Sequence, residues 1–214
     1  MSKSNPPKSS QPKRGVDKAK QILQGALPEF LQHGYSCTSM DRIARAAGVS
    51  KQTLYSYYHD KDGLFTALIE NMTQQKFQVV WSKPLKGKPE TVLRELANRI
   101  LTGIQEEEYL NFIRLIVSQS GKRADLCQLF LKTVSQPAIQ HLTQYFEQNQ
   151  ELQLKDAEAT AGIFIGSIAY FIMSQELFHG KEIMPMNRDR FVDNLIDLIL
   201  SRYKKPPLTS GRSE

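Results

Sequence analysis

The chain has few of the residues on which disulfide scaffolds and metal sites depend. Its two cysteines, Cys37 and Cys127, are too few for a disulfide framework and lack the clustered spacing of a metal site. Its four histidines are scattered along the 214 residues, so we expect no metal. We also find no nucleophile–base pair and no phosphate-binding loop, and we therefore expect no cofactor and no enzyme activity.

Long hydrophobic runs are also missing. The N-terminus is rich in Lys, Ser and Pro and has no apolar stretch, so it does not resemble a signal peptide. The longest uncharged run, Ala159 to Gln175, has 17 residues and contains Thr, Gly, Ser and Gln. It falls short of the ~20 apolar residues that a membrane span needs, and it favours a buried helix. We expect a cytoplasmic protein that does not bind membranes.

Acidic residues are scarce at one end of the chain only. Residues 1–60 hold nine Lys and Arg against four Asp and Glu, a net charge of +5, whereas residues 61–214 have a net charge of only +1. Such asymmetry indicates that the first quarter meets a polyanion or an anionic membrane surface.

Strict apolar–polar alternation is absent, and a helical period dominates, so the pattern predicts an all-α fold of about nine helices. The expected organisation is a disordered basic tail (1–15), a three-helix domain (16–61), a second helical domain (62–205) and a disordered tail (206–214). Within the first helix, Gly34 predicts the stop, and Gly25 and Pro28 predict a kink or break.

Two short helices near the basic end form a helix-turn-helix pattern. Ser39–Ala47 and Lys51–His59 are joined by a turn in which Gly48 allows a left-handed backbone. Ser50 is the expected N-cap of the second helix. That helix exposes Lys and Tyr, which reach phosphates, with Gln52, which can pair with adenine, and Thr53, whose methyl can meet thymine. The pattern predicts that this helix enters a DNA major groove.

Residues 16–72 resemble the DNA-binding domain of the tetracycline-repressor (TetR, AcrR-like) family of bacterial regulators. The matching positions run in register across all the predicted helices: Ala26, Phe30, Gly34, Tyr35, Thr38, Ile43, Ala44, Ala47, Gly48, Val49, Ser50, Thr53, Leu54, Tyr55, Tyr57, Tyr58, Lys61 and Leu64. Gly25 departs from the alanine usual in the family. The resemblance implies a homodimer that presents one recognition helix to each half of a palindromic operator, with repression as the usual outcome.

The resemblance also implies roles for individual residues at the DNA. The base-edge candidates are Lys51, Gln52 and Thr53. The phosphate candidates are Ser50 at the helix start, Thr38, Tyr55, Tyr57, Lys61 and Arg42. For Arg42, an ordinary solvated surface charge is an equally good interpretation. The basic tail is compatible with insertion into a minor groove and, equally, with a solubilising arm.

The second domain carries the ligand and dimer assignments that the resemblance implies. The expected cavity holds a small-molecule effector that is apolar or amphipathic, and its candidate wall residues are Phe77, Trp81, Phe112, Ile116, Gln119, Cys127, Phe130, Val134 and Phe164. The run 155–179 is apolar nearly all round, so we expect it to be buried on more than one side. The candidate dimer residues are Ile165, Ile168, Ile172, Phe191, Leu195 and Ile199, with a single protomer's core as the competing interpretation.

Two other functions compete with the DNA-binding regulator. An all-α carrier or enzyme with an incidental helix-turn-helix leaves the charge asymmetry unexplained. A membrane-surface protein needs a basic amphipathic helix with bulky apolar residues, whereas the segment after Ser50 exposes Lys, Gln, Thr and Tyr.

Overall fold

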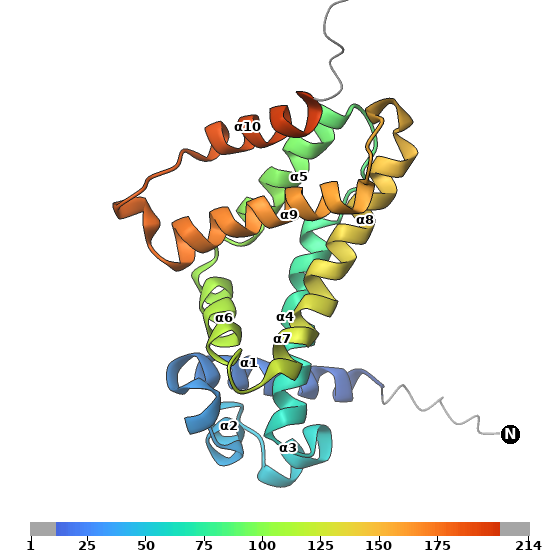
Figure 1. Cartoon of the computed structure of the whole chain (residues 1–214). Helices are drawn as coiled ribbons and strands as arrows, with labels where there is room; N and C mark the ends of the chain where they lie inside the picture. Colours follow the sequence, from blue (N-terminus) through green and yellow to red (C-terminus); the bar gives the residue numbers. More distant parts are fainter. Residues whose placement is uncertain (1–11, 202–214) are drawn as a thin grey trace, which may run out of the picture. The chain divides into compact units, whose positions relative to one another are not determined.

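A computed structural model describes residues 12–201, and every regular element in that range is a helix (Figure 1). The α-helices are α1 (Pro12–Cys37), α2 (Met40–Ala46), α3 (Lys51–Tyr58), α4 (Lys61–Val80), α5 (Pro89–Gly103), α6 (Glu107–Ser118), α7 (Ala124–Phe130), α8 (Gln136–Gln148), α9 (Ala157–Ile172) and α10 (Arg188–Leu200). A π-helical turn, Leu131–Ser135, joins α7 to α8, and another, Met173–Leu177, extends α9. Within residues 12–201 the chain thus has nine continuous α-helical stretches and two single 3-10 turns, Gln150–Leu152 and Gly180–Glu182, which confirms the all-α prediction.

The chain divides into two compact units between Asn71 and Met72. The sequence placed this boundary ten residues earlier, at the start of α4. The difference arises because the first half of α4 supplies Leu64, Phe65 and Leu68 to the core of the N-terminal unit. The α1 helix begins at Pro12, inside the predicted N-terminal tail. The rest of that tail and the predicted C-terminal tail lie outside the described residues.

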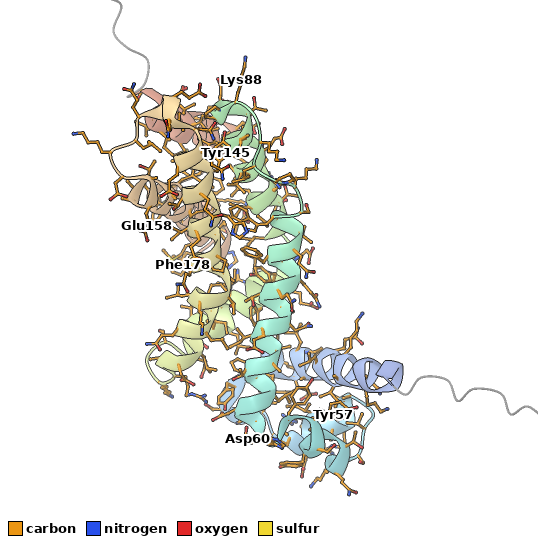
Figure 2. All side chains as sticks on the ribbon, turned by 90° about the vertical axis from the view of Figure 1, so that its right-hand side faces the viewer. Tyr57, Asp60, Lys88, Tyr145, Glu158 and Phe178 are labelled. Carbon is orange, nitrogen blue, oxygen red and sulfur yellow. The ribbon has the colours of Figure 1, made fainter. Side chains whose placement is uncertain are left out.

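Side-chain caps fix where the short helices begin. Ser39 Oγ accepts a hydrogen bond from the backbone N–H of Arg42, and Ser50 Oγ accepts one from the N–H of Thr53. Asp60 stands at the start of α4 (Figure 2), and its carboxylate accepts from the N–H of Gly63 at 2.7 Å. These side chains satisfy amide groups that have no partner within the helix, which is the reason such residues favour helix starts.

The predicted break near Gly25 and Pro28 is wrong. Within α1, the residue with non-helical backbone angles is Gly34, at φ 71° and ψ 169°, which confirms Gly34 as the stop. Gly25 serves a different need, because a Cβ atom at this position would lie 2.5 Å from Cα of Ala47. Glycine therefore lets α1 approach the backbone at the end of α2, without interrupting the helix.

An aromatic cluster fills the centre of the N-terminal unit. The rings of Phe30 and Phe65 meet edge to face with centroids 4.8 Å apart, and Tyr35 lies 4.9 Å from Phe65. Ile22, Ile43 and other aliphatic side chains complete a core from which solvent is excluded. Edge-to-face aromatic pairs add specific geometry to the burial of apolar area, so this cluster sets how α1 and α4 cross.

The core of the C-terminal unit lies where α8 and α5 pack against α9, and where α10 packs against α5 and α9 (Figure 1). All six candidate dimer residues belong to this core. Ile168, Ile172, Leu195 and Ile199 are buried within the single chain, and the remaining two are packed against them: Ile165 and Phe191. The burial of these side chains within one chain favours the competing interpretation of a single protomer's core, although Leu195 and Ile199 also line a groove at the surface.

Only one face of α9 is buried in the described chain. Ile163 is 62 % exposed and Tyr170 is 56 % exposed, contrary to the expectation that this helix is covered on more than one side. The continuous helix Ala157–Leu177 has 21 residues and is long and apolar enough to cross a membrane by length and composition. The length of this helix corrects the conclusion, drawn from the 17-residue uncharged run, that the segment is too short to span a membrane. Such a helix is weak evidence for a membrane span, since core helices of soluble proteins meet the same criteria.

Candidate DNA-binding surface and ligand cavity

The turn between α2 and α3 is held by backbone groups. Gly48 adopts φ +62°, as predicted, and the N–H of Val49 donates to the carbonyl of Ala44 at 3.0 Å. From α1, the side-chain amide of Gln21 donates to the carbonyl of Ala47 at 2.7 Å. Two short helices, α2 and α3, thus flank a turn fixed by these hydrogen bonds, so the local fold predicted from the sequence is present.

The α3 helix buries one side chain and presents the others. Leu54 is fully buried, whereas Lys51 and Gln52 are exposed and Tyr55 and Tyr57 are 44 % and 39 % exposed. The hydroxyls of Ser50 and Thr53 share a hydrogen bond of 2.8 Å, so these two groups already have a partner. The exposed side chains combine positive charge, an amide and two phenols, which suits contact with phosphates and base edges.

Two of the basic candidates carry ion pairs to nearby acids. Lys51 Nζ lies 2.5 Å from the carboxylate of Asp41, and Arg42 Nε lies 3.7 Å from that of Glu29. Both basic side chains are more than 40 % exposed, so these pairs contribute little to stability and leave the cations accessible to an incoming polyanion.

Thr38 and Lys61 do not present their polar groups as the sequence suggested. Thr38 is 2 % exposed, and its hydroxyl donates to the carbonyl of Gly34 at 2.7 Å. The ammonium of Lys61 donates to three carbonyls, those of Tyr35, Ser36 and Thr38, at 2.9, 3.3 and 3.1 Å. It also lies 4.5 Å from the centre of the Tyr35 ring.

These contacts use all three ammonium N–H groups of Lys61. Both residues therefore hold the stretch from Gly34 to Thr38, which covers the end of α1 beyond its kink and the link to α2, and in this conformation neither presents its polar group to a phosphate. Periodicity could not reveal this, because the three carbonyls belong to residues more than twenty positions away in sequence.

Tyr58 is partly buried and faces α1. Its hydroxyl donates to the carbonyl of Ala19 on α1 at 3.3 Å. Burial, with a smaller contribution from the neighbouring Tyr57, raises the pKa of Tyr58 above its ordinary value. Tyr58 consequently links α3 to α1, while Tyr57 stays accessible.

A second candidate site lies inside the C-terminal unit. A cavity of about 150 Å³ opens among α4, α5, α8 and α9, and its walls are almost entirely apolar. Helix α4 supplies one wall through residues spaced three or four apart, and four of the predicted wall residues are present: Phe77, Trp81, Phe130 and Val134. The π-helical turn after α7 supplies Val134 and Ser135, and such turns often occur at functional sites.

The other predicted wall residues lie elsewhere. Phe112, Ile116 and Phe164 are packed in the interior, Gln119 is buried, and Cys127 directs its thiol to the carbonyl of Ile116 at 3.6 Å. Instead, the lining includes residues that the sequence either omitted or assigned to the dimer: Thr73, Lys76, Val80, Ile100, Ile104, Tyr109, Ile165, Ile168 and Ile172. Lys76 could have been found from its spacing, since it shares a helical face with Val80 and Thr73.

Comparison with known proteins agrees with this architecture. Residues 22–68 match the model of the tetR family of bacterial regulatory proteins, and residues 91–205 match the C-terminal domain of AefR-like transcriptional repressors. The second match alone covers more than half of the chain. The chain belongs to the TetR family. It is a transcriptional regulator with a DNA-binding helix-turn-helix, as the resemblance predicted.

TetR-family relatives match well beyond the DNA-binding unit. The HTH-type transcriptional regulator YhgD of Bacillus subtilis is 26 % identical over 175 residues, which cover 77 % of this chain and 87 % of the relative. A TetR-family regulator from Mesorhizobium loti superposes with a TM-score of 0.75 at 24 % identity, covering 88 % of this chain and 98 % of the other. The flavonoid-responsive regulator FrrA superposes with a TM-score of 0.69 at 25 % identity, covering 88 % and 95 %.

Gln52 provides a test of base reading by the TetR-type recognition helix. We expect Gln52→Ala to weaken operator binding by ~1–3 kcal/mol at the bases that its amide pairs with, because a bidentate contact discriminates by that amount. Binding to random DNA should be unchanged. Fluorescence anisotropy with both DNAs measures the difference, and an equal loss on the two would assign Gln52 to the DNA backbone.

Proposed function

We propose that this protein is a ligand-responsive repressor that binds a palindromic operator as a homodimer in the cytoplasm and leaves it when a small molecule enters the α4–α9 cavity. The observation that carries the proposal is the position of α4 in the chain. Its first half belongs to the DNA-binding unit, and its second half supplies Thr73, Phe77 and Val80 to the cavity wall. One continuous helix thus has residues in both units.

The physical basis of the response is linkage between two binding sites. The dimer binds the operator when its two recognition helices have the correct separation. A ligand that binds more tightly to the cavity in a conformation with another separation lowers operator affinity, typically through 1–3 kcal/mol of coupling. The π-helical turn at Leu131–Ser135 borders the cavity and offers an adaptable wall. Two further observations support a ligand-responsive repressor: the match to AefR-like repressors and the likeness to a flavonoid-responsive regulator.

A gel shift with the DNA that flanks the protein's own gene tests this proposal directly. We expect a retarded complex that dissociates when a small apolar or amphipathic compound fills the cavity. Phe77→Ala provides the matched control, because it alters the cavity wall and leaves α3 unchanged. Failure to bind the flanking DNA, or a complex that no cavity ligand dissociates, would contradict the repressor mechanism.

The proposed dimer face overlaps only in part with the one predicted from the sequence. The exposed apolar side chains of Ile163 on α9 and Leu198 on α10 line one groove, together with the predicted Leu195 and Ile199 and with polar residues at one end. Leu198 is 72 % exposed and Tyr170 on α9 is 56 % exposed. Exposed apolar area of this kind is typical of protein–protein contacts, so we assign this groove to the partner protomer.

Leu198→Arg should convert the dimer to a monomer, because it replaces an apolar contact by a bulky guanidinium that is costly to desolvate in an interface. Analytical ultracentrifugation measures the change, and Val117→Arg on α6, whose side chain is 55 % exposed, is the matched control. If Leu198→Arg stays dimeric, the interface lies elsewhere on the protein.

A further inference from the structure

The cavity wall contains one charged side chain among the described residues that line it, Lys76. Lys76 is largely buried, with 16 % of its side chain exposed. The remaining lining is aromatic, aliphatic or small, apart from the hydroxyl groups of Thr73, Tyr109 and Ser135. A cation at the edge of an apolar cavity is costly to desolvate unless an anion lies close to it.

The anion recorded beside Lys76 comes from the solvent side. Lys76 Nζ lies 2.5 Å from the carboxylate of Glu106, whose side chain is 70 % exposed. Glu106 sits in the short connection between α5 and α6 and directly precedes α6. The pair therefore joins a buried cation to an exposed acid. Water solvates the Glu106 carboxylate once it leaves Lys76, so another anion can replace it at a small cost in free energy.

Tyr109 does not neutralise Lys76. The ammonium lies 5.3 Å from the centre of the Tyr109 ring, a cation–π contact. Burial raises the pKa of Tyr109 to about 12, so the phenol stays protonated and uncharged at physiological pH. The ring contributes a face with negative electrostatic potential rather than a full charge. Tyr109 therefore does not compete with a carboxylate for the charge of Lys76.

We propose that the cavity selects a small carboxylate with an apolar body, whose carboxylate takes the place of Glu106 beside Lys76. This inference rests on the proposed function, since it names the ligand class of the same cavity. An uncharged ligand leaves the Lys76–Glu106 pair unchanged and gains no binding free energy from the charge of Lys76. A carboxylate that reaches Lys76 from inside meets the cation in a lower dielectric, where the attraction is stronger than at the surface.

Size and lining define the apolar part of the ligand. A cavity of about 150 Å³ is large enough for a benzene-sized molecule, as an engineered protein cavity of that size shows. The rings of Phe77 and Trp81 stack with centroids 5.6 Å apart, and Phe130 adds a third aromatic side chain. One aromatic ring bearing a short carboxylate arm fits this combination of walls and charge.

Trp81 makes the test specific, because it is the chain's one tryptophan and it lines the cavity. The full-length protein is titrated with phenylacetate and, separately, with the uncharged phenylacetamide, while the fluorescence of Trp81 is recorded. We expect phenylacetate to bind about tenfold more tightly or better, the usual gain from a hydrogen bond between charged groups. Lys76→Met should abolish this preference, and Glu106→Gln should tighten phenylacetate binding by removing the competing carboxylate.

Lys86→Met is the matched control, since Lys86 is an exposed lysine in the connection before α5 and should keep the wild-type preference. Thermal unfolding checks that each variant is folded, and Glu106→Gln still tests the proposal if Lys76→Met is unstable. Equal affinities for the two compounds in the wild type, no response of Trp81 to phenylacetate, or a preference that survives in Lys76→Met would overturn the inference.

A gel shift with the same compounds separates this inference from the proposed function. If Lys76-dependent binding of phenylacetate leaves the operator complex intact, the ligand class stands and ligand-controlled repression fails. If an uncharged apolar compound releases the operator while phenylacetate does not bind, repression stands and the carboxylate assignment fails.

Discussion

Replacing Gly25 with alanine should destabilise the DNA-binding unit by about 3 kcal/mol or more, near the upper end of the range for overpacked sites. The added methyl group would lie 2.5 Å from Cα, 2.6 Å from the backbone nitrogen and 2.7 Å from Cβ of Ala47. Backbone atoms cannot move aside as a flexible side chain can, so α1 and α2 must separate. Amide hydrogen exchange in residues 20–60 measures the loss, because it reports on this unit separately.

The same substitution should abolish operator binding at temperatures where the rest of the protein is folded. Ala47 precedes the turn that directs α3, so displacing it changes the position of the whole recognition helix. Gln24→Ala is the matched control, since Gln24 is exposed on the same helix and surface substitutions usually change stability by less than about 0.5 kcal/mol. Normal protection and operator affinity in Gly25→Ala would show that α1 does not approach Ala47 this closely.

Lys61→Met should weaken operator binding without changing how that binding depends on salt. The substitution keeps an unbranched apolar stem and removes the ammonium that binds the carbonyls of Tyr35, Ser36 and Thr38. We expect the segment between α1 and α2 to loosen, at a cost of about 2 kcal/mol, the magnitude typical of hydrogen bonds to a charged group. Hydrogen exchange in residues 34–40 measures this local change.

The salt dependence decides between this role and a contact with DNA. A lysine that neutralises a phosphate changes the slope of log K against log salt by about one unit per site, whereas a lysine occupied by backbone carbonyls does not. Lys20→Met, which removes an exposed lysine of the same unit, should leave the segment between α1 and α2 as rigid as in the wild type. A slope that flattens in Lys61→Met with unchanged hydrogen exchange would restore the phosphate assignment.

Features that depend on neighbouring residues in sequence could be predicted well. Ser50 is the expected helix cap, Gly34 ends the regular part of α1 as expected, and Gly48 has the positive φ value assigned to it. Each of these outcomes depends on contacts within about four residues, where side-chain chemistry and backbone angles largely determine the conformation. The helix-turn-helix, built from such local features, was therefore predictable.

Features that depend on distant segments were not predictable in the same way. The local sequence around Gly25 predicts a break in the helix, but the requirement for glycine at this position comes from Ala47, twenty-two residues away. The type and register of Lys61 fit a phosphate ligand of the family, whereas the position of its ammonium is set by carbonyls at the end of α1 and at Thr38. The residues next to a glycine do not distinguish a helix break from a close approach between helices. Those next to a lysine do not distinguish a phosphate ligand from a ligand of backbone carbonyls.

Charge distribution, helical period and helix caps are local properties of the chain, and they suffice to predict an all-α, TetR-type regulator with a basic DNA-binding end. Which apolar faces pack against each other depends on contacts between distant segments. Helix α9 is apolar on nearly every side, so its composition could not tell Ile168, which is buried in its own protomer, from Ile163, which is exposed. The helices that pack against α9 make this distinction, and they leave exposed the face proposed for the dimer and form the wall of the cavity beside Lys76.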